Sequence, residues 1–270
     1  MDDTARILTL APPPADTTIA YAPDPLQFGD LRLPAGHGPW PVVVVIHGGF
    51  WKAAYSLDHI GWLCQALTRL GYATWSLEYR RVGQPGGGWP GTFLDVAQGV
   101  KYVRALARRF PLDLDRVGVV GHSAGGHLAL WVAGAQRVPA DSPLHVDDPL
   151  PVRGAVSLAG VSDLRRAWEL RLGSDAVAAL MSGGPDDHPD RYAAASPQAL
   201  LPLGVRQVVV HGTADPNVPY ELGQRYYEAA RALGDDVTLL TLPDMGHFEV
   251  IDPYSAAWPT VQQAVGYVLS

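Results

Sequence analysis

A short apolar run that turns directly into a helix is the feature that most constrains how this chain can fold. Val117–Val120 has the composition of a buried strand, and His127–Trp131 continues as an apolar helix. The segment Gly121-His-Ser-Ala-Gly125 stands between them and fits the pattern G-x-S-x-G. So tight a turn places its middle residue on a sharp bend, and the flanking glycines leave room for it. We therefore expect the hydroxyl of Ser123 at a helix N-terminus, where backbone N–H groups can stabilise a developing negative charge.

The same alternation of strand and helix extends over most of the chain. Pro41–Ile46 is a continuous β-branched run, typical of a strand that is buried on both faces. Further strands are expected over residues 72–78, 154–159, 205–211 and 237–242. Helices are expected over residues 57–70, 93–109, 220–233 and 256–269. Right-handed crossovers through such helices predict an α/β fold with a mostly parallel, doubly wound sheet flanked by helices.

Residues 1–270 are expected to form one domain. A chain of 270 residues with 47% hydrophobic and 17% charged residues can bury a sizeable core. Many prolines occur within residues 1–40, which restricts the extended pieces at 17–21 and 28–33 to edge strands. The segment 161–204, with helical patches at 164–172 and 175–181, is long enough to form a small cap over a site.

Charge and cysteine content exclude several classes of function. A formal net charge of −7 argues against non-specific binding to nucleic acid or to an anionic membrane. The single cysteine, Cys64, excludes an internal disulfide framework. The sequence shows no signal-peptide pattern and no apolar run long enough to span a bilayer. These features predict a soluble, cytoplasmic protein with no nucleic-acid or membrane partner, and they leave the oligomeric state open. A mature secreted protein would show the same features.

Chemically reactive side chains follow four of the predicted strands. His47 follows the strand at 41–46, and Ser123, Asp215 and His247 come after three others. Parallel strands end at one edge of a sheet, so we expect these residues to converge there. A serine hydroxyl needs a base to accept its proton, and that base needs a carboxylate to hold its tautomer. The chain order Ser123, Asp215, His247 is the order found in α/β-hydrolases.

Other acids and histidines compete for these roles less well. Asp244 and Asp252 flank His247 within its own loop, and Asp163 is better placed to cap the helix that follows it. His122 and His127 are five residues apart, so they do not share the helical face that a metal site with i, i+4 spacing requires. We therefore expect no metal and no other cofactor.

Two motifs resemble one branch of the α/β-hydrolase superfamily. His47-Gly-Gly-Phe-Trp51 and Gly121-His-Ser-Ala-Gly-Gly-His127 resemble the small serine esterases, the hormone-sensitive-lipase-like enzymes and the arylformamidases, which include the kynurenine formamidases. His211-Gly-Thr-Ala-Asp-Pro-Asn-Val-Pro219 is similar to the catalytic domain of prolyl-oligopeptidase-type peptidases. The lipase loop usually reads His-Gly-Gly-Gly, and Phe50 replaces its third glycine. This departure favours the formamidase and feruloyl-esterase-like side.

The resemblance implies a role for each matched residue. Ser123 would be the nucleophile, Asp215 the orienting acid and His247 the general base. The backbone N–H groups of Gly49, Phe50 and Ala124 would form the oxyanion hole. His47 is expected to brace this loop rather than to transfer protons.

Aromatic and thioether side chains in loops are candidates for the apolar wall of a substrate pocket. The candidates are Trp51, Trp89, Trp168, Met181 and Phe248. Packing in the core is an equally good interpretation of each of them.

Together these residues predict a serine hydrolase that cleaves small carboxylic esters through an acyl-enzyme on Ser123. An arylformamidase that hydrolyses an N-formylkynurenine-type amide would use the same catalytic atoms and is the alternative. A peptidase is less expected, since no propeller or large gating domain precedes residue 41. A non-catalytic binding scaffold usually lacks one member of the triad, and none is missing here.

Overall fold

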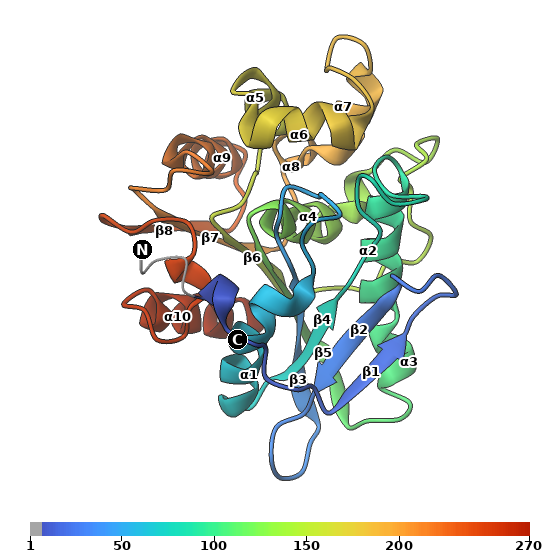
Figure 1. Ribbon diagram of the computed structural model, residues 1–270, viewed down its shortest axis with the longest axis vertical. Helices are drawn as coiled ribbons and strands as arrows, with labels where there is room; N and C mark the ends of the chain where they lie inside the picture. The colour runs from blue at the N-terminus through green and yellow to red at the C-terminus, as the bar shows by residue number, and fades with distance from the viewer. Residues whose placement is uncertain (1–6) are drawn as a thin grey trace.

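An eight-stranded sheet runs through the centre of the molecule (Figure 1). The computed structural model describes residues 7–270. The strand order across the sheet is β1-β2-β4-β3-β5-β6-β7-β8. The strands are β1 (Thr17–Ala20), β2 (Phe28–Arg32), β3 (Trp40–Ile46), β4 (Ala73–Leu77), β5 (Leu112–His122), β6 (Gly154–Leu158), β7 (Arg206–Gly212) and β8 (Val237–Leu242).

The six strands from β4 to β8 are parallel, which confirms the predicted architecture. The two N-terminal strands pair antiparallel at one edge, β1 with β2 and β2 with β4. Because the parallel strands share one direction, the loops that follow them meet at one edge of the sheet.

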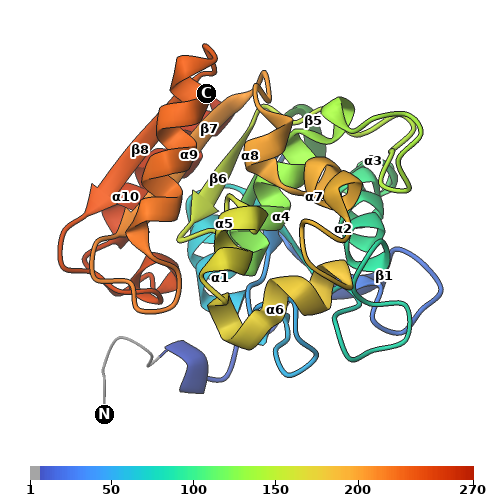
Figure 2. The same cartoon turned by 90° about the horizontal axis from the view of Figure 1, so that it is seen from above.

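Helices cover both faces of the sheet, and the pattern of β3 shows why its β-branched run is continuous. Val42 and Val44 pack into one core, and Val43 and Val45 pack into the other. The first core contains residues of α2 (Gly91–Lys101), α4 (Ala124–Ala133) and α9 (Tyr220–Ala232). The second contains residues of α1 (Gly61–Arg69) and α10 (Trp258–Leu269). Figure 2 shows helices on both sides of the sheet. A strand between two helical layers has no polar face.

Two of the predicted elements differ clearly from the observed ones. The helix expected over 93–109 is divided into α2 and the short α3 (Val103–Leu106). The strand that leads to Ser123 begins at Leu112 rather than at Val117, because Leu112 already pairs with Trp40 of β3. The first half of this strand was not predicted because residues 113–116 are mostly charged. Short 3-10 turns are η2 (Leu57–Ile60), η3 (Ala135–Arg137) and η4 (Glu249–Ile251).

The segment between β6 and β7 is mostly helical. It contains α5 (Leu164–Glu169), α6 (Leu172–Met181), α7 (Pro189–Ala195) and α8 (Pro197–Leu200). Sequence analysis missed α7 and α8, which both start with proline, a residue that fits the first turn of a helix. Figure 1 shows α5, α6 and α7 together beyond α4. No helix within residues 7–270 is long and apolar enough to cross a lipid bilayer.

His127 of α4 joins the sheet core to this helical segment. Its Nε2 lies 2.9 Å from the carbonyl oxygen of Ala195, and the rings of Trp51 and Phe93 meet it edge to face. Burial lowers the pKa of His127 to about 4, although the bond to Ala195 opposes this shift. The ring is therefore neutral in the folded protein at neutral pH.

We expect the buried His127 to make the protein less stable in mild acid. In the unfolded chain the imidazole takes up a proton near pH 6.5, whereas in the folded chain it does so near pH 4. Between these values the unfolded state binds more protons, so the free energy of unfolding falls as the pH falls. At pH 4 the loss reaches about 3 kcal/mol.

Urea unfolding between pH 7 and pH 4 would measure this effect. His127→Gln should show a shallower decline than the wild type, since amide side chains do not titrate. His37→Gln, at an exposed loop position, is the matched control and should decline as the wild type does. The assignment would be wrong if all three proteins declined equally.

Candidate active site

Ser123 occupies a strained turn between β5 and α4. Its backbone has φ 58° and ψ −119°, a conformation that a residue with a side chain rarely adopts. The two glycines of the motif allow it. A Cβ atom on Gly121 would lie 1.9 Å from the carbonyl oxygen of Gly125, and one on Gly125 would lie 2.1 Å from that of Ile46. The predicted strand, tight turn and helix are therefore present, for the steric reason given above.

Asp215 and His247 form a buried pair. Nδ1 of His247 lies 2.7 Å from Oδ2 of Asp215, whose side chain is fully buried. Oδ1 of Asp215 accepts hydrogen bonds from the backbone N–H groups of Asn217 and Val218. This arrangement fixes the carboxylate and leaves Nε2 of the imidazole available for chemistry.

The charge of Asp215 is stabilised by its neighbours. Burial alone would raise the pKa of this carboxyl, but hydrogen bonds from His211 and His247 and the backbone N–H of Val218 lower it well below the usual range. Nε2 of His211 lies 3.5 Å from Oδ2 of Asp215 and 2.9 Å from the carbonyl oxygen of Val218. Asp215 is therefore ionised at neutral pH.

The competing acids lie elsewhere. Asp163 accepts a hydrogen bond from the backbone N–H of Arg166 and caps α5, as expected. Asp244 is exposed, and Asp252 accepts from the backbone N–H of Tyr254. The carboxylate bonded to His247 is that of Asp215.

Ser123 and His247 line one pocket of about 100 Å³. Within residues 7–270 the Ser123 hydroxyl makes no hydrogen bond, so it is free to act on a molecule in this pocket. Most of the lining side chains carry rings. The complete lining is Leu8, Gly49, Phe50, Tyr55, His59, His122, Ser123, Asn217, His247 and Phe248.

The loop after β3 presents free backbone donors beside Ser123. Gly49, Phe50 and Trp51 all have positive φ, at 107°, 49° and 54°. Within residues 7–270 the backbone N–H groups of Gly49, Phe50 and Ala124 make no hydrogen bond. Gly49, Phe50 and Ser123 share the pocket, and Ala124 directly follows Ser123 at the start of α4. These donors are therefore available to an oxygen atom bound near the serine.

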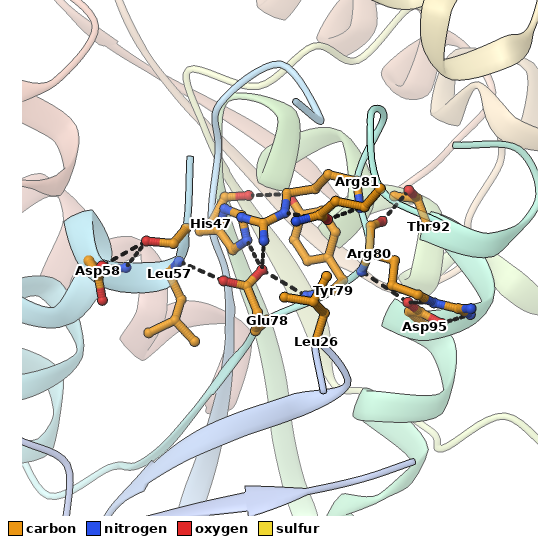
Figure 3. A network of polar contacts seen from close by, with 12 residues as sticks. Leu26, His47, Leu57, Asp58, Glu78, Tyr79, Arg80, Arg81, Thr92 and Asp95 are labelled. Carbon is orange, nitrogen blue, oxygen red and sulfur yellow. Dashed lines mark hydrogen bonds and ion pairs between the residues drawn. The ribbon is translucent and has the colours of Figure 1, made fainter. Parts of the chain in front are cut away.

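A buried polar network holds the start of this loop (Figure 3). Nε2 of His47 lies 3.0 Å from Oε1 of Glu78, and Nδ1 lies 2.8 Å from the carbonyl oxygen of Gly48. The guanidinium of Arg81 lies 3.2 Å from Oε1 of Glu78, whose Oε2 accepts from the backbone N–H of Leu57. Burial would raise the pKa of Glu78, but His47 and Arg81 outweigh it and lower that pKa. His47 thus braces the loop, as expected.

The observed lining differs from the one expected from the sequence at four of five positions. Phe248 lines the pocket, whereas Trp51 and Met181 are fully buried in the core. Trp51 has a positive φ, and its ring packs in the core on the ring of His127, with the two ring centroids 5.2 Å apart. Trp89 and Trp168 lie outside this lining, and Trp89 packs against Phe93 and Arg191 instead.

Two histidines that were not among the expected lining residues, His59 and His122, line the pocket. Burial, followed by the neighbouring His47, lowers the pKa of His59 to about 3. Burial, together with His247 and His59, lowers the pKa of His122 well below its usual range. Nε2 of His122 lies 2.9 Å from the carbonyl oxygen of His247, so it supports the loop that carries this residue. The sequence signal that pointed to His122 was its position directly before Ser123 in the G-x-S-x-G motif.

Comparison with known proteins places the chain in a family. Residues 30–229, well over half of the chain, match the BD-FAE family. LipC of Mycobacterium tuberculosis, an esterase, is 28% identical over 87% of this chain and 60% of its own length. The esterase LipQ of the same organism is 28% identical over 77% of this chain and 50% of its own length. The chain thus spans little more than half the length of these relatives.

Solved structures share the fold. A truncated carbohydrate esterase from gut microbiota superposes with a TM-score of 0.81 at 21% identity, over 96% of this chain and 98% of that one. The α/β-hydrolase fold expected from the sequence is therefore confirmed, and the arylformamidase-like branch stays a prediction. By the match over residues 30–229, the chain belongs to the BD-FAE family.

Proposed function

We propose that this protein is a serine hydrolase that cleaves small carboxylic esters through an acyl-enzyme on Ser123. The observation that carries the proposal is the pocket shared by Ser123 and His247, with His247 bonded to the buried Asp215. The two relatives LipC and LipQ are esterases and support the same class of reaction.

In the first half of the reaction, Nε2 of His247 takes the proton of the Ser123 hydroxyl as Oγ attacks the ester carbonyl carbon. The carbonyl oxygen becomes negatively charged and accepts hydrogen bonds from the backbone N–H groups of Gly49, Phe50 and Ala124. His247 then donates its proton to the leaving oxygen. The C–O bond breaks, the alcohol departs and the acyl group remains on Ser123.

In the second half, water replaces the alcohol. His247 removes a proton from the water, the resulting hydroxide attacks the acyl carbon, and the same three N–H groups bind the oxyanion. The imidazolium returns its proton to Oγ of Ser123, and the free acid leaves. Asp215 keeps the Nδ1–H tautomer of His247 in both halves and stabilises the imidazolium by its charge.

The pocket favours a short acyl group. Its volume of about 100 Å³ is small compared with roughly 300–1,000 Å³ for pockets that enclose drug-sized ligands. Phe50, Tyr55 and Phe248 supply apolar walls close to Ser123. A small acyl chain fits such a space, whereas a long one would have to leave it.

Ser123→Ala should remove nearly all ester hydrolysis, because it removes the nucleophilic oxygen. We expect kcat to fall by roughly 10⁴–10⁶ with an unchanged thermal midpoint. Steady-state hydrolysis of p-nitrophenyl acetate and labelling by a fluorophosphonate probe would measure this. Substantial turnover by the folded variant would contradict the role of Ser123.

Asp215→Asn should lower kcat by roughly 10⁴, because the amide holds the wrong tautomer of the imidazole. Asp244→Asn is the matched control, since Asp244 is an exposed aspartate near His247 with φ 58°, which asparagine tolerates. The control should keep wild-type kcat. A larger loss at Asp244 than at Asp215 would reassign the acid.

A substrate panel would test the bond and the acyl length together. We expect kcat/KM for naphthyl esters to fall at least about tenfold from butyrate to octanoate, because the longer chain exceeds the pocket. N-formylkynurenine should be hydrolysed more slowly than naphthyl acetate. Faster hydrolysis of the formamide would favour the arylformamidase alternative, and a flat chain-length profile would contradict the inferred pocket size.

A further inference from the structure

The loop that carries Gly49 and Phe50 is held in a conformation that it would not adopt alone. Phe50 and Trp51 are non-glycine residues with positive φ, each unfavourable by about 1–3 kcal/mol. Such residues persist only where their surroundings determine the backbone. The contacts on each side of the loop therefore decide where its free N–H groups point.

The core side of the loop is held by the segment after β4. The backbone N–H of Val82 donates to the carbonyl oxygen of Trp51 at 2.8 Å, and that of Ala53 donates to Val82 at 3.0 Å. Tyr55 closes another side, because a Cβ atom on Gly49 would lie 2.4 Å from the Cβ of Tyr55. The side chains of Phe50 and Lys52 contact a third segment, the start of α6 (Leu172–Met181).

The ring of Phe50 lies against Gly173, at the start of α6. A Cβ atom on Gly173 would lie 2.5 Å from Cδ1 of Phe50 and 2.6 Å from Cγ, so only glycine allows this approach. Figure 2 shows α6 beside the loop that follows β3. The two segments are more than a hundred positions apart in the sequence.

Lys52 joins the same two segments. Its ammonium donates to the carbonyl oxygen of Gly173 at 2.6 Å. Within residues 7–270 Lys52 forms no ion pair with a carboxylate, so the carbonyl group of Gly173 is the polar partner of its ammonium. A charge-assisted bond of this kind is about twice as strong as a neutral one.

The backbone around Gly173 is strained as well. Arg171, Gly173, Ser174 and Asp175 all have positive φ, between 53° and 60°. The Arg171–Asp175 ion pair spans the turn but is exposed on both sides, so it contributes little. Two strained segments therefore meet through the Phe50 ring and the Lys52 ammonium.

We propose that Lys52 and Gly173 are positioning residues through which the 161–204 segment holds Phe50, and with it the oxyanion donor, in place. The inference rests on the proposed function, which gives the Phe50 N–H its role. It assigns to the predicted cap a part in the chemical step, and not only in covering the pocket. A displaced Phe50 would weaken a bond that forms only with the charged intermediate, so kcat should fall while KM changes little.

Lys52→Met tests the tether, because it keeps the aliphatic stem and removes the donor. The sequence contains two lysines, and the other, Lys101, donates to the carbonyl oxygen of Asp147 at 2.8 Å in an exposed region. Lys101→Met is therefore the matched control. We expect kcat for naphthyl acetate to fall about tenfold in Lys52→Met, less than the 10²–10³ of a lost oxyanion donor. KM should stay within about twofold, Lys52→Arg should restore most of kcat and Lys101→Met should equal the wild type.

A double-mutant cycle tests the Phe50 contact. Gly173→Ala should lower kcat in the wild-type background, because the new methyl group displaces the ring. In a Phe50→Ala background, which keeps the backbone N–H, the same change should leave kcat unaltered. Any loss of stability from an alanine at φ 60° would occur in both backgrounds and would appear in the thermal midpoint.

Hydrogen exchange gives a readout that does not depend on catalysis. Exchange in peptides covering residues 48–55 and 171–176 should be faster in Lys52→Met than in Lys101→Met. If the wild type hydrolysed no ester while exchange followed Lys52, the proposed function would fail and the coupling would stand. If the wild type hydrolysed esters and Lys52→Met matched it in kcat and in exchange, the coupling would be wrong.

Discussion

The arrangement of the site depends on the close contact between two backbone segments at the carboxyl ends of neighbouring strands. β3 and β5 pair in parallel up to Ile46 and Gly121, so the loop after β3 and the turn after β5 begin at the same level. Gly125 then packs directly on the carbonyl oxygens of Ile46 and His47, where a side chain would overlap both. This contact sets the distance between the Ser123 hydroxyl and the free N–H groups of the loop. Any residue larger than glycine would separate them.

Charges around the pocket are kept apart by neutral rings. Asp215 lies at one end with His247, and Glu78 lies at the other with His47 and Arg81. Both carboxylates are buried, and hydrogen bonds stabilise their charge. Between them the rings of His59 and His122 have lowered pKa values and stay neutral. In the proposed reaction, an imidazolium at His247 would therefore meet a carboxylate on one side and no positive charge on the adjacent ring of His122.

The helical segment between β6 and β7 contacts the elements of the site at two places, through α7 and through the start of α6. α7 accepts hydrogen bonds from His127 and Trp131 of α4, and the start of α6 contacts Phe50 and Lys52. The same segment thus stabilises the helix that follows Ser123 and the loop that faces it. The description of the chain as one domain with a small cap at 161–204 stays a prediction. The cytoplasmic location also stays a prediction.

The sequence by itself determined the alternation of strands and helices, the sharp turn at Ser123 and the order of Ser123, Asp215 and His247. These features follow from local patterns, since strand composition, glycine sterics and strand direction act over a few residues. Only the tertiary structure decided which rings face the pocket. Trp51 packs in the core while its neighbour Phe50 lines the pocket, and His59 reaches the pocket from the 3-10 turn η2. Glu78 and Gly173 likewise act through contacts with segments that lie far from them in the sequence. Such contacts depend on packing between distant elements, which no local pattern of residues specifies.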